Sequence, residues 1–195
     1  MKAIMISLLS IFIATGVQAQ EYYTNGALLD GGDSVRFTCT VEQSRGQTYV
    51  TLRTGKADDY MPQKSEGYYD GYSVSFQWNL FKPIVAKAFT LEQLDGIPET
   101  PLIINVIGNR KGTIVYMEAW FASNAWTNRI PPSTWGDLFR TLQREVKFLF
   151  ADSTNNQLIP EAPEESYYRL GGQIELIFYF DKIAQILKNN ESVGN

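Results

Sequence analysis

The fold is decided by residues 101–150, which read PLIINVIGNRKGTIVYMEAWFASNAWTNRIPPSTWGDLFRTLQREVKFLF. Within this stretch, residues 102–108 and 113–121 are rich in β-branched and aromatic side chains, which is typical of strands. The loop between them, residues 109–112, ends in glycine, and glycine supplies the positive φ that short hairpin loops need. The pattern therefore predicts an antiparallel hairpin.

The side chains of this hairpin divide into two faces if Ile107 pairs with Ile114. One face is wholly apolar: Leu102, Ile104, Val106, Val115, Met117, Ala119 and Phe121. The other is mixed: Ile103, Asn105, Ile107, Ile114, Tyr116, Glu118 and Trp120. A slip by one residue would interchange the two sets, so burial should fix the register. We expect the apolar face to lie in the core.

A helix is predicted directly after the double proline at 131–132. Thr134 and Asp137 resemble a capping box with Asp in place of Glu. Apolar side chains follow at helical spacing: Trp135, Leu138, Phe139, Leu142, Val146 and Leu149. Their burial is worth roughly 1.5–3 kcal/mol each before entropy is subtracted. On the opposite side, Arg140, Arg144 and Lys147 suggest a solvated face, with an anion site as the alternative.

Strand and helix signals elsewhere complete an α+β pattern. Strands are predicted at 35–41 and 48–54, at 72–79 with Val74, Phe76 and Trp78 inward, and at 173–180. A helix is predicted over 81–95. We therefore expect antiparallel sheets with two packed helices, and a strand-hairpin-helix-strand unit in the second half. The long polar segment 56–71 is a candidate functional loop, and residues 151–172 form a second long polar segment.

Residues 1–19 have the pattern of a secretory signal. Lys2 precedes an apolar run, and residues 17–19 read Val-Gln-Ala, which fits the small-residue cleavage pattern. The run is too short to span a bilayer. Residues 20–195 are therefore expected to form a single exported domain without a membrane span, in the periplasm, outside the cell or on its surface. The prolines near 97–101 leave open a division into two packed halves, 20–97 and 98–195.

Composition excludes several classes of function. The net charge of −4 argues against non-specific nucleic-acid binding, which needs a basic surface. The chain has no histidine and one cysteine, which removes Ser-His-Asp catalysis, thiolate clusters and histidine metal sites. We expect no cofactor, no metal and no catalytic residue. Cys39 alternates with apolar neighbours and is interpreted as a small buried hydrophobe, with a reactive thiol as the alternative.

Aromatic and acidic residues provide the remaining candidate sites. Glu118 lies between Tyr116 and Trp120 and is the best candidate for a carboxylate-dependent hydrolase, although an outward carboxylate on the sheet is the simpler interpretation. Paired tyrosines suit protein or sugar recognition, while half-buried edge tyrosines are the alternative. The candidate contact residues are Tyr68, Tyr69, Tyr116, Glu118, Trp120, Tyr167 and Tyr168.

Four short segments carry a resemblance to a known superfamily: Phe81-Lys82-Pro83, residues 112–115 (Gly-Thr-Ile-Val), Val146-Lys147-Phe148 and residues 174–180. In order and pattern they resemble the TonB C-terminal-domain superfamily, over residues 81–181. The resemblance implies a hairpin, a helix and a closing strand whose free edge accepts a partner strand. The chain lacks the membrane anchor and proline-rich spacer of the energy transducers, so coupling to an inner-membrane motor is not implied.

The expected function is that of an exported, non-enzymatic protein that acts through protein contacts in the bacterial envelope. The absence of paired cysteines favours that compartment over an animal extracellular space. The alternatives are a glycan-binding module that uses exposed tyrosine and tryptophan, and a carboxylate-dependent hydrolase.

Overall fold

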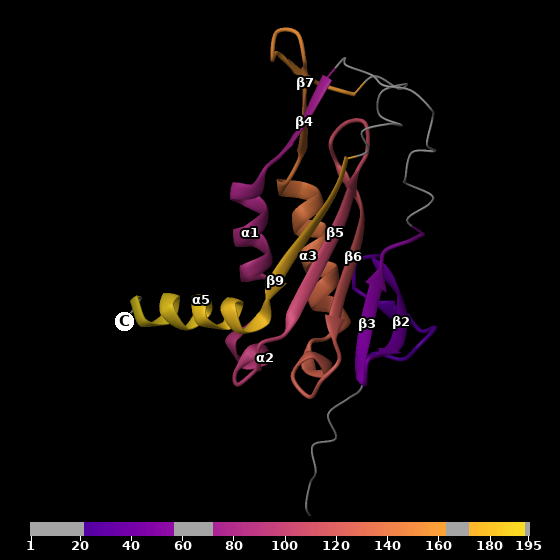
Figure 1. The fold of residues 1–195 in the computed structure, drawn as a ribbon, viewed down its shortest axis with the longest axis vertical. Coiled ribbons are helices and arrows are strands. Elements are labelled where there is room, and N and C mark those ends of the chain that lie inside the picture. Colours follow the sequence, from indigo (N-terminus) through magenta and orange to yellow (C-terminus); the bar gives the residue numbers. More distant parts are fainter. Residues whose placement is uncertain (1–21, 57–71, 163–171, 194–195) are drawn as a thin grey trace, which may run out of the picture.

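The computed structural model describes residues 22–56, 72–162 and 172–193, and these form an α+β fold (Figure 1). The main sheet is antiparallel and has six strands in the order β1-β2-β3-β6-β5-β9. Their bounds are β1 Leu28–Asp30, β2 Arg36–Ser44, β3 Gln47–Arg53, β5 Pro101–Gly108, β6 Ile114–Ala122 and β9 Gly172–Tyr179. Segments 20–97 and 98–195 thus both contribute strands to one sheet.

A smaller sheet and the helices surround this main sheet. The smaller sheet has the order β4-β7-β8, with β4 Tyr72–Phe76, β7 Phe148–Asp152 and β8 Leu158–Ile159. The helices are α1 Trp78–Lys87, α2 Leu91–Leu94, α3 Pro132–Glu145 and α5 Phe180–Val193, with a 3₁₀ turn, η2, at Thr127–Arg129. Among the described residues no helix is long and apolar enough to cross a membrane.

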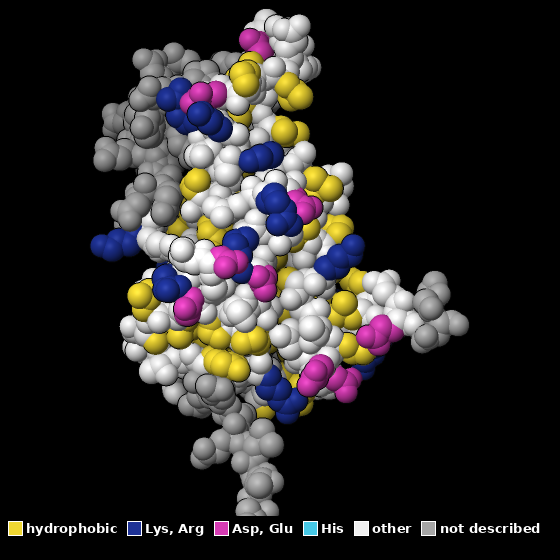
Figure 2. All heavy atoms as spheres, turned by 180° about the vertical axis from the view of Figure 1, so that it is seen from behind, with side chains coloured by type: hydrophobic (Ala, Val, Ile, Leu, Met, Phe, Trp, Pro, Cys, Tyr) yellow, Lys and Arg dark blue, Asp and Glu magenta, His cyan; other side chains and the backbone are white. Residues whose placement is uncertain are grey.

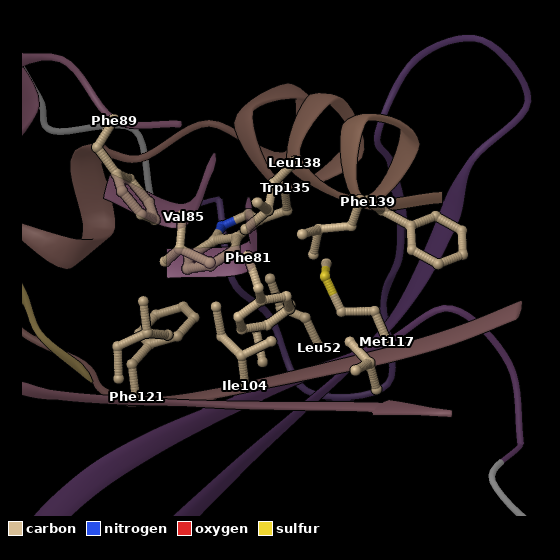
Figure 3. Close-up of a cluster of buried hydrophobic side chains, with 14 of the residues drawn as sticks. Leu52, Phe81, Val85, Phe89, Ile104, Met117, Phe121, Trp135, Leu138 and Phe139 are labelled. Carbon is tan, nitrogen blue, oxygen red and sulfur yellow. The ribbon is translucent and has the colours of Figure 1, made fainter. Parts of the chain in front are cut away.

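The core lies between α1, α3 and one face of the six-stranded sheet, which we call the inner face (Figures 1 and 3). Phe81, Val85, Trp135 and Leu138 enter it from the helices, and Leu52, Ile104, Met117 and Phe121 from the strands. The rings of Phe121 and Trp135 stack with centroids 5.1 Å apart and planes 9° apart. This contact packs α3 against β6, near the middle of the sheet.

The predicted hairpin is confirmed as β5 and β6, but the predicted register is wrong by two residues. Ile107 pairs with Tyr116, and a bulge then places Gly108 opposite Ile114. The error of two preserves the assignment of faces along most of the hairpin, because side chains alternate with period two. The bulge reverses the assignment of faces at the start of β6. Ile114 is fully buried in the core, whereas Val115 is only half-buried and lies outside the core.

Gly112 at the end of the hairpin loop is required for two reasons. Its φ is +73°, a conformation that L side chains rarely adopt. A Cβ at this position would also lie 2.1 Å from the carbonyl oxygen of Phe148. The loop therefore packs directly on the start of β7.

The N-terminal hairpin of β2 and β3 is also confirmed. Its turn is Arg45-Gly46, and both residues have positive φ, +53° and +77°, as in the two-residue type I′ turns that suit twisted strands. Cys39 points to the inner face and is 1% exposed, which confirms its interpretation as a core residue. Burial raises the pKa of its thiol to about 11.

The helix predicted over 81–95 is wrong, because the chain forms two helices there. α1 begins at Trp78, which is therefore not a strand residue, and ends at Lys87. Thr90 then starts α2 with a capping box: its hydroxyl accepts from the backbone N–H of Gln93, and the Gln93 side chain accepts from the backbone N–H of Thr90. A strong N-cap signal inside an apolar-periodic stretch divides it.

The helix predicted after Pro131 is confirmed as α3, with corrections at both ends. The N-cap is Pro131 and has no side-chain cap, so the capping box predicted for Thr134 and Asp137 is wrong. Instead, the Thr134 hydroxyl accepts a 3.2 Å hydrogen bond from Gln93 Nε2. The helix ends at Glu145, so Leu149 belongs to β7.

The basic residues of this region contact groups of the chain itself. Arg140 pairs with Asp137 and with Asp33 at 3.5 Å, and Arg144 pairs with Glu145 at 2.7 Å. Figure 2, which views the helical side, shows basic and acidic side chains interspersed there. This arrangement fits the solvated-face interpretation of Arg140 and Arg144.

Candidate functional site

The face of the six-stranded sheet opposite the helices, which we call the outer face, is the candidate site. Figure 1 looks onto it, with α3 behind the strands. The register aligns its side chains in rows that cross the strands. One row is polar: Arg53, Glu118, Asn105 and Glu175. The next is mainly apolar: Thr51, Trp120, Ile103 and Ile177.

Aromatic and aliphatic side chains form a band across four strands of the outer face. The outer band comprises Tyr49 of β3, Trp120 of β6, Ile103 of β5, and Ile177 and Tyr179 of β9. The rings of Tyr49 and Trp120 stack with centroids 4.4 Å apart and planes 16° apart. Ile177 is 57% exposed and Tyr179 40% exposed, so the band is most open on β9.

The polar row beside the band is held by an ion pair. Arg53 Nε donates to Glu118 Oε2 at 2.5 Å, and the Arg53 guanidinium also donates to the Thr40 hydroxyl at 3.2 Å. The Tyr116 hydroxyl donates to the same Glu118 oxygen at 3.2 Å. Burial raises the pKa of Tyr116 well above its ordinary value, and the neighbouring Glu118 carboxylate raises it further. Tyr116 is therefore a neutral hydrogen-bond donor at physiological pH.

This arrangement gives Glu118 a structural role in the sheet. The ion pair of Glu118 with Arg53 links β6 to β3. Glu175 lies in the same row but on β9, with Asn105 between them. In the parts of the chain that the structure describes, no group of three or more His, Cys, Asp or Glu is placed to hold a metal.

The structure brings together three of the seven residues that the sequence indicated. Tyr116, Glu118 and Trp120 all lie on the outer face, with Tyr116 buried and the other two half-buried. Tyr68, Tyr69, Tyr167 and Tyr168 lie outside the described residues, as do residues 1–19.

Sequence reasoning placed Ile103 on the mixed face of the hairpin but did not indicate it as a contact residue. It missed the other members of the site, Tyr49, Arg53, Ile177 and Tyr179. The alternation in β9 contains a signal for Ile177 and Tyr179, because Ile174, Leu176 and Phe178 occupy the other parity and pack against the core. For Tyr49 and Arg53 the sequence has no comparable signal. Their place depends on the pairing of β3 with β6, which lies more than sixty residues away along the chain.

Comparison with known proteins supports the fold. No family model matches the chain, and neither does any curated protein. A crystal structure of a DUF5043 family protein from Bacteroides uniformis superposes with a TM-score of 0.53 and 17% identity. The match covers 81% of this chain and 86% of the other. At this identity the similarity shows a shared α+β fold alone.

Proposed function

We propose that the protein is an exported, non-enzymatic component of the bacterial envelope that binds another protein through the outer band. The observation that carries the proposal is the exposure of Ile177 and Tyr179 on the face that also carries the Trp120–Tyr49 stack. Ile103 lies between Ile177 and Trp120 and links the two parts of the band. Single exposed apolar side chains are ordinary on protein surfaces, but contiguous ones indicate contact sites. Aromatic side chains with a charged rim are typical of such sites, and here the Arg53–Glu118 pair provides charged groups beside the band.

The edge of the sheet supports a protein partner as well. Among the described strands, β9 pairs with β5 alone, and β9 carries the two most exposed members of the outer band. A partner strand added to β9 would make backbone hydrogen bonds and continue the band. The resemblance of residues 81–181 to TonB C-terminal domains stays a prediction that points the same way.

Export rests on the sequence of residues 1–19, and the single cysteine is compatible with it. That pattern is typical of a secretory signal. Cys39 is free and buried in the core, so the fold does not depend on the redox state of its compartment. The periplasm and the cell surface both suit such a protein.

The test is a pull-down from envelope extracts with charge variants of the band. A buried charge without a partner is costly, so Ile177→Glu and Tyr179→Glu should each lose a discrete partner that the unchanged protein captures. The matched control is Ile186→Glu on α5, whose side chain is 48% exposed and lies outside the band. A protein that captures no partner, or a partner retained by both band variants, contradicts the proposal.

Glycan binding is the second candidate, because the Trp120–Tyr49 stack and Tyr179 provide aromatic rings on an open sheet. Tryptophan fluorescence across a polysaccharide panel separates the two functions. A sugar-dependent shift that disappears in Trp120→Phe favours glycan binding. No shift with any sugar leaves the protein partner.

A carboxylate-dependent hydrolase, the third function considered from the sequence, requires Glu118 to act on a substrate. Its carboxylate is already bound by Arg53 and Tyr116. Glu118→Gln tests this function directly, since hydrolysis of a polysaccharide that stops in this variant would support it.

A further inference from the structure

A surface cavity of about 460 Å³, open to solvent, lies between the loop of the β5–β6 hairpin and the small sheet. Its lining includes Lys111 from the loop, Lys147 directly before β7 and Leu149 within it. Leu158 and Ile159 of β8 and Pro160 after it complete this lining. None of these residues belongs to the outer band. The volume is within the range of small-molecule sites, about 300–1,000 Å³.

The backbone holds the walls of this cavity in place. The hairpin loop is joined to β7 by a 2.9 Å hydrogen bond from the Phe148 N–H to the Gly112 carbonyl and by a bridge between Thr113 and Lys147. On the same strand, Phe150 pairs with Ile159 and Ala151 with Leu158. Leu149 therefore lies between the hairpin loop and β8, both of which are attached to the backbone at or beside β7.

The cavity exposes apolar surface that the fold itself does not cover. Leu158 is 70% exposed, the highest value among the large hydrophobic side chains of the described residues. Leu149 is half-buried and shares a face of the small sheet with Leu158, because Leu158 pairs with Ala151. Ile159 pairs with Phe150 and packs against the core on the other face. A ligand with an apolar body would remove this surface from water, which is favourable in proportion to the area covered.

The charged side chains that line the cavity, those of Lys111 and Lys147, are both basic. The Lys147 ammonium is positioned by a 2.9 Å hydrogen bond to the Thr113 hydroxyl, which leaves two of its three donors available. Within the described residues neither Lys111 nor Lys147 forms an ion pair. Glu161, which follows Pro160, pairs instead with Arg110 at 3.6 Å.

We propose that this cavity binds a small anionic amphiphile, a carboxylate or sulfonate joined to an apolar body. The apolar body lies against Leu149 and Leu158, and the anionic head meets the ammonium groups of Lys111 and Lys147. Charge-assisted hydrogen bonds from lysine to a carboxylate are stronger than neutral ones, so the head group decides which amphiphile is retained. The site is separate from the proposed protein interface.

Isothermal titration calorimetry with decanoate, 1-decanol and decylammonium tests the head group. Decanoate should bind saturably with one molecule per chain. Decanol should bind at least about tenfold more weakly and decylammonium not measurably, because both lack the anion. Raising the salt concentration should weaken decanoate binding, because exposed charges are screened.

Variants at exposed positions test the place of binding without disturbing the core. Lys111→Gln and Lys147→Gln should each weaken decanoate binding by about three- to tenfold, the scale of one partly exposed ion pair. Leu158→Glu should abolish binding, because it adds a negative charge at the apolar wall. The matched controls are Lys82→Gln on α1 and Leu28→Glu on β1, where Leu28 is 68% exposed.

The proposal fails if decanol binds as tightly as decanoate, if decanoate shows no saturable binding, or if the control variants weaken binding as much as the cavity variants. Vesicles of phosphatidylglycerol provide the remaining comparison. Binding to these vesicles without binding to free decanoate would overturn a small-ligand site and indicate a membrane surface instead.

Discussion

The indole Nε1 of Trp135 donates a 2.8 Å hydrogen bond to the hydroxyl of Tyr23, 112 residues earlier in the chain. The Tyr23 hydroxyl in turn donates to the backbone carbonyl of Ile130. All three residues are buried, and the ring of Tyr23 lies against Phe121 with centroids 5.4 Å apart. This chain of hydrogen bonds fastens the segment before β1 to the start of α3.

Replacing Tyr23 by phenylalanine removes that link and leaves a buried donor and a buried acceptor without partners. We expect Tyr23→Phe to lower the free energy of unfolding by about 1–3 kcal/mol, measured by urea denaturation. The control is Tyr49→Phe, whose hydroxyl meets Gln47 at an exposed position. Its effect should stay within about 0.5 kcal/mol. Equal losses in the two variants would contradict the structural role of Tyr23.

Stability should fall in alkaline solution because of Cys39. Burial raises the pKa of this thiol from 9.0 to about 11. The unfolded chain therefore loses the proton at lower pH than the native protein does. This contribution to the free energy of unfolding is fully present below pH 9 and is lost as the pH rises to 11.

Urea denaturation of the reduced protein across this pH range measures the effect. Cys39→Ala should be less stable at neutral pH, because it leaves a cavity, but its stability should decline less between pH 9 and 11. Tyr23 adds a further loss at higher pH in both proteins, since burial raises its pKa as well. The same slope with and without the thiol would contradict the assignment.

Gly136 allows α3 to approach the turn before β2 very closely. A Cβ on Gly136 would lie 1.8 Å from the carbonyl oxygen of Gly31. Gly136→Ala should lower the free energy of unfolding by about 2 kcal/mol or more, although alanine favours helix by about 1 kcal/mol. Ser133→Ala, at an exposed position in the same helix, should change it by less than about 0.5 kcal/mol. A stabilised Gly136→Ala would show that the contact is loose.

The capping box at α2 predicts another difference between variants. Thr90→Ala removes the cap and should lower the free energy of unfolding by about 1 kcal/mol. Asp137→Ala, at the position where the sequence indicated a cap for α3, removes only an exposed ion pair with Arg140. Its effect should be below about 1 kcal/mol and should decrease in high salt. Chemical denaturation at low and high salt distinguishes the two variants, and a salt-sensitive loss in Thr90→Ala would contradict its assignment.

The elements that could be predicted from the sequence are those with local signals. The β5–β6 hairpin follows from two apolar runs around a loop that ends in Gly112, and the inner face follows from the alternation of Leu102, Ile104 and their neighbours. The division of 81–95 into two helices was missed because the apolar period continues across Thr90. The bulge at Gly108 was missed because the predicted pairing assumed an unbroken register along the hairpin. The close approach of the Phe148 ring to Gly108 was missed as well, because Phe148 is distant in the chain.

The candidate site shows the same limit. Alternation within β6 placed Tyr116, Glu118 and Trp120 on one face, and that placement needs no other strand. The partner of Glu118 is Arg53, and the partner of Trp120 is Tyr49, both on β3. No local pattern predicts that β3 lies beside β6, because the choice depends on how the whole sheet buries its inner face.

The strand order also bears on how the chain assembles. The neighbouring strands β5 and β6 are consecutive in the chain and joined by a five-residue loop, so they can associate without closing a long stretch of polypeptide. The flanking strands come from opposite ends of the chain, β3 before them and β9 after them. The β5–β6 hairpin can therefore form first, and β3 and β9 then add to its two sides. A chain that stops short of β9 would leave the edge of β5 unpaired and open to pairing with other chains.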